Sequence, residues 1–211
     1  MQSSRMEPHQ AAEHLQVIRT LMERSALYRR ALAPILLWCG VLGLLGATLG
    51  VLLPASTMFQ FGALWLGAAV LAVAGSFLLA RRQAMRDHEP FWSAPARRVA
   101  QALLPALACG CVLDVLLVLA DAEEILALFV VLSALFYGCA LHAAGFFMVR
   151  GVKLFAWLFI AGGLGLLVFL SLVQPDFETR QAHLCMGGFF GAAHLAYGLY
   201  LEFTRRPEAA S

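Results

Sequence analysis

The sequence has few charged residues: only 13% of its 211 residues are Asp, Glu, Lys or Arg, while 61% are hydrophobic. A soluble domain is typically about 25% charged and about 45–50% apolar. A soluble protein of this length cannot bury so much apolar surface, and disordered or nucleic-acid-binding chains carry far more charge. The mean hydropathy of +0.78 therefore indicates an integral membrane protein. We expect the lipid bilayer as its partner, and we expect no binding to nucleic acid.

A disulfide framework and the familiar catalytic motifs are also missing. The five cysteines are an odd number, and no two of them form a Cys-x-x-Cys pair. All of them lie inside apolar runs: Cys39, Cys109, Cys111, Cys139 and Cys185. No Walker, kinase, rhomboid-like or metalloprotease motif occurs in the sequence. We therefore expect no catalytic residue, no cofactor and no metal site.

Long uncharged runs predict where the chain crosses the membrane. No charge occurs in the 50 residues between Arg30 and Arg81, and about 20 apolar residues cross a bilayer, so this run holds two spans and a turn. The runs do not alternate as the strands of a membrane barrel do. The sequence thus predicts an all-α polytopic membrane protein whose transmembrane domain, residues 31–203, is a six-helix bundle. Its spans are expected at about 31–53, 61–80, 99–120, 125–149, 154–173 and 183–203.

Basic residues are distributed very unevenly among the connecting segments. Fourteen of the 15 lie in the N-terminal segment 1–30, the second and fourth loops or the tail 204–211, and Arg180 alone lies in the other three loops. By the positive-inside rule, both termini are cytoplasmic. Arginine greatly outnumbers lysine, of which Lys153 is the sole example, and this bias is typical of GC-rich bacterial genomes. We therefore expect a multi-pass protein of the bacterial inner (plasma) membrane.

Residues 9–30 predict a cytoplasmic amphipathic helix before the first span. Leu15, Ile18 and Met22 recur at three- and four-residue spacing and form one apolar stripe. Glu13, Glu23 and the arginines occupy much of the remaining surface, and arginines of this kind meet anionic lipid when a helix lies on the inner leaflet. The same helix is also able to dock a membrane or cytoplasmic protein partner.

Two further patterns concern helix ends and helix packing. Asp121 and Glu124 have the N-cap and N3 spacing expected at the start of the fourth span. Glycines fall on one side of the first, fourth and sixth spans, where small residues let helices approach closely in lipid. These glycines are Gly43, Gly46 and Gly50; Gly138 and Gly145; and Gly187, Gly191 and Gly198.

Three ionisable residues within the spans are the candidate functional residues: Asp114, His142 and His194. Both histidines lie near glycines of their own helices, so they are expected to point toward neighbouring helices. One interpretation is interhelical hydrogen bonding, a structural role common for histidine in membranes. A second is an intramembrane polar path for a proton or cation, since the ordinary pKa of histidine lies near 6.5. A third is one haem held between His142 and His194.

Three motifs resemble those of a family of uncharacterised six-span bacterial inner-membrane proteins. They are Ile18-Arg19-Thr20-Leu21-Met22-Glu23-Arg24, Glu89-Pro90-Phe91-Trp92-Ser93-Ala94-Pro95-Ala96-Arg97-Arg98, and Gly188-Phe189-Phe190-Gly191-Ala192-Ala193-His194 with Gly198. The resemblance covers nearly the whole chain. It implies a six-helix inner-membrane protein and transfers no activity.

The function that the sequence favours is a small transporter, transport accessory or membrane sensor without catalysis of its own. Two alternatives stay open. One is a redox membrane subunit with a single haem, and the other is a structural scaffold that recruits a partner through its N-terminal helix.

Overall fold

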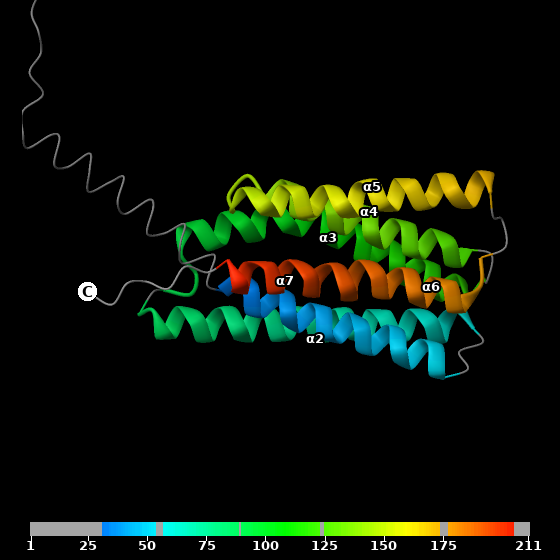
Figure 1. The fold of residues 1–211 in the computed structure, drawn as a ribbon, viewed down its shortest axis with the longest axis horizontal. Helices are drawn as coiled ribbons and strands as arrows, with labels where there is room; N and C mark the ends of the chain where they lie inside the picture. The colour runs from blue at the N-terminus through cyan, green and yellow to red at the C-terminus, as the bar shows by residue number, and fades with distance from the viewer. Residues whose placement is uncertain (1–30, 54–56, 89, 123–124, 174–176, 205–211) are drawn as a thin grey trace, which may run out of the picture.

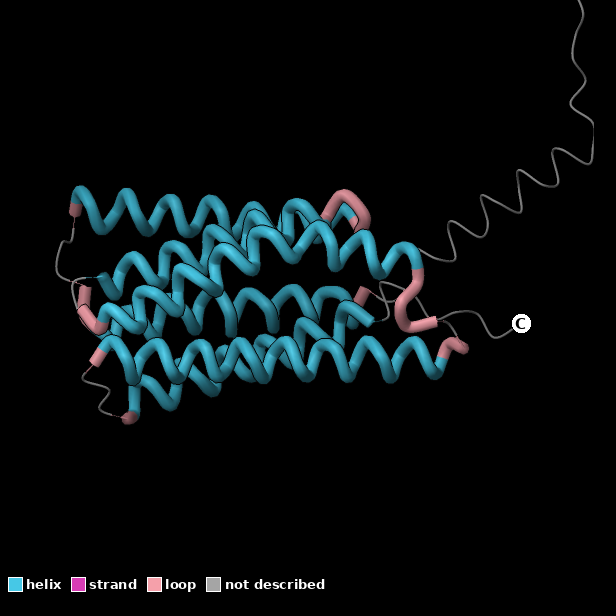
Figure 2. Tube along the Cα trace, turned by 180° about the vertical axis from the view of Figure 1, so that it is seen from behind, coloured by secondary structure: helices cyan, strands magenta, loops and turns pink. Residues whose placement is uncertain are grey.

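The computed structural model describes residues 31–53, 57–88, 90–122, 125–173 and 177–204. Within these ranges six helices are long and apolar enough to cross a membrane, and no strand occurs. Figures 1 and 2 show the helices side by side along the long axis, with turns at both ends. The predicted all-helical fold is confirmed, and it indicates a multi-pass integral membrane protein. The predicted amphipathic helix of residues 9–30 lies outside the described residues.

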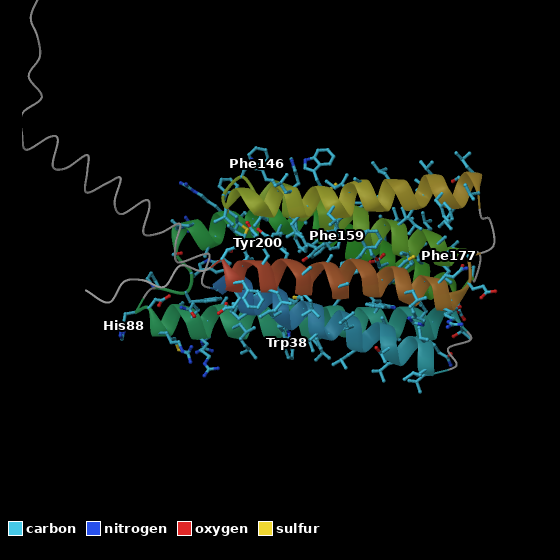
Figure 3. The ribbon with its side chains drawn as sticks, in the orientation of Figure 1. Trp38, His88, Phe146, Phe159, Phe177 and Tyr200 are labelled. Carbon is cyan, nitrogen blue, oxygen red and sulfur yellow. The ribbon has the colours of Figure 1, made fainter. Side chains whose placement is uncertain are left out.

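The helices have the following bounds. The first spans Ala31–Leu52, and it is followed by α2 (Met58–Arg86), α3 (Ala94–Ala120), α4 (Leu126–Ala144), α5 (Arg150–Leu172), α6 (Thr179–Met186), the π-helical turn η2 (Gly187–Ala192) and α7 (Ala193–Phe203). The last three elements form one continuous span. His88 and Phe177 lie at opposite ends of the bundle (Figure 3), which we call the His88 end and the Phe177 end.

Four helices are longer than the hydropathy pattern predicts, most of all α2 and α3, and α4 is shorter. With 29 and 27 residues, α2 and α3 are about 43 and 40 Å long at 1.5 Å per residue. A hydrocarbon core of about 30 Å leaves their ends near His88 in the headgroup layer. Helix α4 ends at Ala144, because the apolar residues 145–149 form the turn into α5.

Asp121 caps a helix other than the predicted one. Helix α4 has Ile125 at its N-cap and no side-chain cap. Asp121 instead ends α3 in the left-handed conformation, with φ of 44°. Its carboxylate Oδ1 accepts a hydrogen bond of 2.9 Å from the backbone N–H of Phe59, in the first turn of α2. The predicted capping of the fourth span by Asp121 is therefore wrong, because the N-cap of α4 lies four residues later and the carboxylate lies beside the start of α2. Glu124 lies outside the described residues.

Replacing Asp121 should therefore loosen the contact between α3 and α2. For Asp121→Ala we expect a free energy of unfolding lower by about 2 kcal/mol, because a cap is lost and alanine disfavours the left-handed conformation. Asp121→Asn retains an acceptor oxygen and tolerates this conformation, so its loss should be much smaller. Thermal unfolding in detergent micelles measures both variants, and equal losses would contradict the capping role.

The predicted glycine packing is confirmed between the first helix and the last span. A Cβ atom on Gly43 would overlap the Phe190 carbonyl, and one on Gly50 would overlap the His183 ring. From the other side, Gly191 approaches Leu44 and Gly198 approaches Leu37. Small residues on both helices thus bring the two backbones together, as is typical of helix pairs in lipid.

Two apolar clusters fill the interior of the bundle. The cluster toward the Phe177 end includes Phe61, Trp65, Phe129 and Met186. The cluster toward the His88 end includes Leu36, Phe155, Phe159 and Leu201. Phe190 packs against both clusters. The polar residues of the interior lie among these side chains.

Candidate functional site: buried polar groups within the bundle

His194 is the central polar residue of the bundle. Its side chain is only 2% exposed. The Nε2 atom lies 2.6 Å from the hydroxyl of Tyr137 on α4, and Nδ1 lies 3.2 Å from the carbonyl oxygen of Phe189 in η2. Both ring nitrogens are therefore hydrogen-bonded within the protein.

These partners determine where the proton of the neutral ring lies. A carbonyl oxygen only accepts, so Nδ1 carries the proton that is donated to Phe189. Nε2 then has a free lone pair and accepts the hydroxyl proton of Tyr137. In the neutral state His194 thus presents a bare, basic nitrogen to Tyr137.

Aromatic rings surround the His194–Tyr137 pair. The ring centres of Phe155, Phe159 and Phe190 lie 5.1, 5.4 and 6.1 Å from that of His194. Together with the burial of the histidine, these rings exclude lipid and bulk water from the pair. The surroundings of His194 are therefore apolar apart from its two hydrogen-bond partners.

The π-helical turn η2 directly precedes His194. In this turn the N–H of Ala193 bonds to the carbonyl of Gly188, five residues earlier. One additional residue in a turn rotates the helix that follows the turn by about 100° relative to the helix that precedes it. Regular α-helical spacing would place His183 and His194 on one side, yet His183 faces α2 while His194 faces α4 and α5. Such turns frequently occur at functional sites.

Asp114 forms a second buried pair with α4. Its side chain is 9% exposed, and Ser133 donates a hydrogen bond of 2.9 Å to Oδ2. The other oxygen, Oδ1, is buried and has no partner among the described residues. Ser133 precedes Tyr137 by four residues, so the two hydroxyl side chains lie one above the other on α4. Helix α4 therefore connects Asp114 with His194.

Tyr197 extends this series of polar groups toward the His88 end. It lies three residues after His194 on α7, and its ring stacks on that of Phe155 with centres 4.8 Å apart. Its hydroxyl lies beside Gly151 in the first turn of α5. The polar residues thus extend from Asp114, about 9 Å inside the Phe177 end of the bundle, to the first turn of α5 at the His88 end.

His183 is a further buried polar residue, which the sequence places on the same helix side as His194 but not among the three candidate residues. It is fully buried, and Trp65 donates a hydrogen bond of 3.0 Å to its Nδ1 atom. The proton of the neutral ring therefore lies on Nε2, which is buried without a partner among the described residues. A histidine eleven residues before His194 was visible in the sequence, but its contact with Trp65 on α2 was not.

His142 lies apart from the other candidate residues. It is half-buried, and its ring contacts Phe146 and Trp157, with centres 5.5 and 5.7 Å away. Both of these aromatic residues are exposed on the outside of the bundle, and Figure 3 shows Phe146 pointing outward. His142 and His194 share none of these neighbours. The structure thus brings Asp114 and His194 to one face of α4, and it does not bring His142 beside them.

The donor set does not form a metal centre in the part of the chain that the structure describes, because no group of three His, Cys, Asp or Glu side chains converges there. To bind the iron of a haem between His142 and His194, His194 would have to give up one of the hydrogen bonds of its two ring nitrogens. The arrangement contains a carboxyl group paired with a hydroxyl group and a basic nitrogen paired with another, and groups of these kinds accept and donate protons.

Comparison with known proteins finds no matching family model, no matching curated protein and no matching solved structure.

Proposed function

We propose that this protein is a small inner-membrane transport protein or transport accessory that conducts protons through its bundle, without catalysis of its own. The observation that carries the proposal is the His194–Tyr137 pair, which is buried in mid-bundle and has Asp114 on one side and Tyr197 on the other. Ionisable residues at such depth are costly and commonly mark ion or proton paths.

The proton would move in the following steps. A proton from the Asp114–Ser133 pair reaches the oxygen of Tyr137, whose own hydroxyl proton passes to the bare Nε2 of His194. His194 then carries protons on both nitrogens and is positively charged among the aromatic rings. Loss of the Nδ1 proton on the side of Tyr197 returns the ring to its neutral form but leaves the proton on Nε2. Reorientation of the imidazole restores the bare Nε2, and Asp114 takes up a new proton from its own side. One full cycle therefore moves one proton through the bundle and leaves the protein unchanged.

The direction of this path follows from the charges at the ends of the bundle. The arginine-rich segments, including the one that connects α2 and α3, favour a cytoplasmic location for the His88 end and for both termini. Asp114 then lies on the outer side and Tyr197 on the inner side.

Proton flux into vesicles tests the proposal. We reconstitute the protein into liposomes that contain a pH-sensitive dye and impose a membrane potential. The wild type should acidify the vesicles, and His194→Gln should reduce the rate at least tenfold because glutamine has no basic nitrogen. Tyr137→Phe should also reduce it, since the hydroxyl next to Nε2 is lost.

His142→Gln provides the matched control. His142 also lies in a membrane-spanning helix, but it contacts the exterior aromatic residues Phe146 and Trp157. Its replacement should therefore leave the flux unchanged. The hydrogen bonds lost in these variants are worth only about 0.6–2 kcal/mol, so the proteins should stay folded. Wild-type flux equal to that of empty liposomes, or full flux in His194→Gln, would overturn the proposal.

A further inference from the structure

The His88 end of the bundle carries a cluster of arginines that no contact among the described residues accounts for. Three lie in the last turns of α2 and two in the first turns of α3, and all are exposed: Arg81, Arg82, Arg86, Arg97 and Arg98. Figure 3 shows this end of the molecule around His88. We call these arginines, together with the aromatic residues described below, the α2–α3 basic surface.

The positive charge of this surface is not compensated within the described residues. None of the five arginines forms an ion pair there. Asp87, the described carboxylate between them, accepts a hydrogen bond of 2.9 Å from Gln83 instead. The N-terminus of α3, capped by Ser93, adds the positive end of a helix dipole next to Arg97 and Arg98. An anion bound here would therefore be favoured by both charge and geometry.

The two arginine pairs lie at the same depth. Helices α2 and α3 are antiparallel neighbours, with Gly62 directly against Val118, and this register places Arg82 level with Arg98. About 20 residues of α2, counted from Met58, cross the hydrocarbon core, so Arg82 lies just beyond it. That is the level at which the phosphates of phospholipids lie.

Aromatic side chains of α2 and of the loop between α2 and α3 lie near the arginines. Phe77, one turn before Arg81 on α2, makes an edge contact with Phe91 at 4.8 Å between ring centres. Phe91 in turn lies 6.2 Å from Trp92, which is 60% exposed. Aromatic residues of this kind are typical of the membrane interface, where they contact the upper part of the acyl chains. A soluble phosphate ion has no acyl chain that could contact these aromatic rings, whereas a phospholipid has.

We infer that the α2–α3 basic surface is a binding site for an anionic phospholipid. The phosphate group binds between Arg82 and Arg98, since guanidinium groups bind phosphate through paired hydrogen bonds. The glycerol backbone and the acyl chains lie against Phe77, Phe91 and Trp92. This inference does not depend on proton conduction.

Lipid binding to the full chain in phosphatidylcholine nanodiscs tests the inference. The probe is phosphatidylglycerol labelled on its acyl chain, measured at low salt. Each interfacial arginine is worth about 1 kcal/mol, which is about fivefold in affinity, so the double variant R82Q/R98Q should bind it about thirtyfold more weakly than the wild type. Trp92→Ala should also weaken binding, through the acyl chains.

The matched control is Arg180→Gln, which removes an exposed arginine at the Phe177 end and should leave binding unchanged. All replaced side chains are exposed, and thermal unfolding verifies that the variants remain folded. Equal affinity of the wild type and R82Q/R98Q would overturn the inference. So would displacement of the labelled lipid by inorganic phosphate at equal concentration, because the site would then be one for a soluble anion.

Discussion

Replacing Phe159 by alanine should lower the free energy of unfolding by about 3–5 kcal/mol. Phe159 is fully buried between α5 and the last span (Figure 3), and its ring centre lies 4.9 Å from Tyr137 and 5.2 Å from Phe155. Helices in lipid associate mainly through close packing. A cavity here therefore removes van der Waals attraction between the helices that no other interaction replaces. The cavity would also adjoin His194.

Phe169→Ala is the matched control for this prediction, because Phe169 lies on the same helix and is 46% exposed. Its loss should change the free energy of unfolding by about 0.5 kcal/mol or less, as is usual for surface positions. Denaturation of both variants in mixed detergent micelles gives the comparison. Equal losses would show that the side of α5 that carries Phe159 does not face the interior of the bundle.

The membrane spans could be predicted because lipid imposes one strong requirement. A span needs about 20 apolar residues and must satisfy its own backbone hydrogen bonds, so the first helix was expected at 31–53 and is found at Ala31–Leu52. The ends of other helices were less predictable. Helix α2 continues to Arg86, six residues past its predicted end, because hydropathy measures the hydrocarbon core and not the helix beyond it.

The candidate site could be predicted only in part. Asp114 and His194 stand out as ionisable residues in apolar runs, and the structure buries both. In a membrane, however, apolar residues face both lipid and interior, so apolar periodicity does not reveal which side of α4 is buried. His142 therefore looked equivalent to His194, although it packs against exterior aromatic residues.

The partners of the buried residues depend on helix packing and were not visible in the sequence. The spacing of Ser133 and Tyr137, four residues apart in an apolar span, shows that two hydroxyl groups share a face of α4, but it does not show what they contact. The π-helical turn had no such signal beyond its glycines. It separates the directions of His183 and His194, and this explains why one bonds to Trp65 and the other to Tyr137.

Gly43→Ala should have the second largest effect on stability, a loss of about 3 kcal/mol, at the upper end of what overpacking usually costs. The added Cβ overlaps the carbonyl of Phe190 and lies 2.6 Å from the backbone nitrogen of Gly191. Backbone atoms of η2 cannot rotate aside as a side chain does, so the first helix and the last span must separate.

The same variant connects packing to the proposed proton path. The Phe189 carbonyl that holds His194 belongs to the turn η2 that Gly43 contacts. Gly43→Ala should therefore also lower proton flux at temperatures where the protein remains folded. Gly67→Ala is the control, because a Cβ there meets nothing within 4 Å, and alanine should leave both stability and flux unchanged or slightly raise stability. Similar behaviour of the two variants would show that the contact between Gly43 and η2 does not hold this span in place.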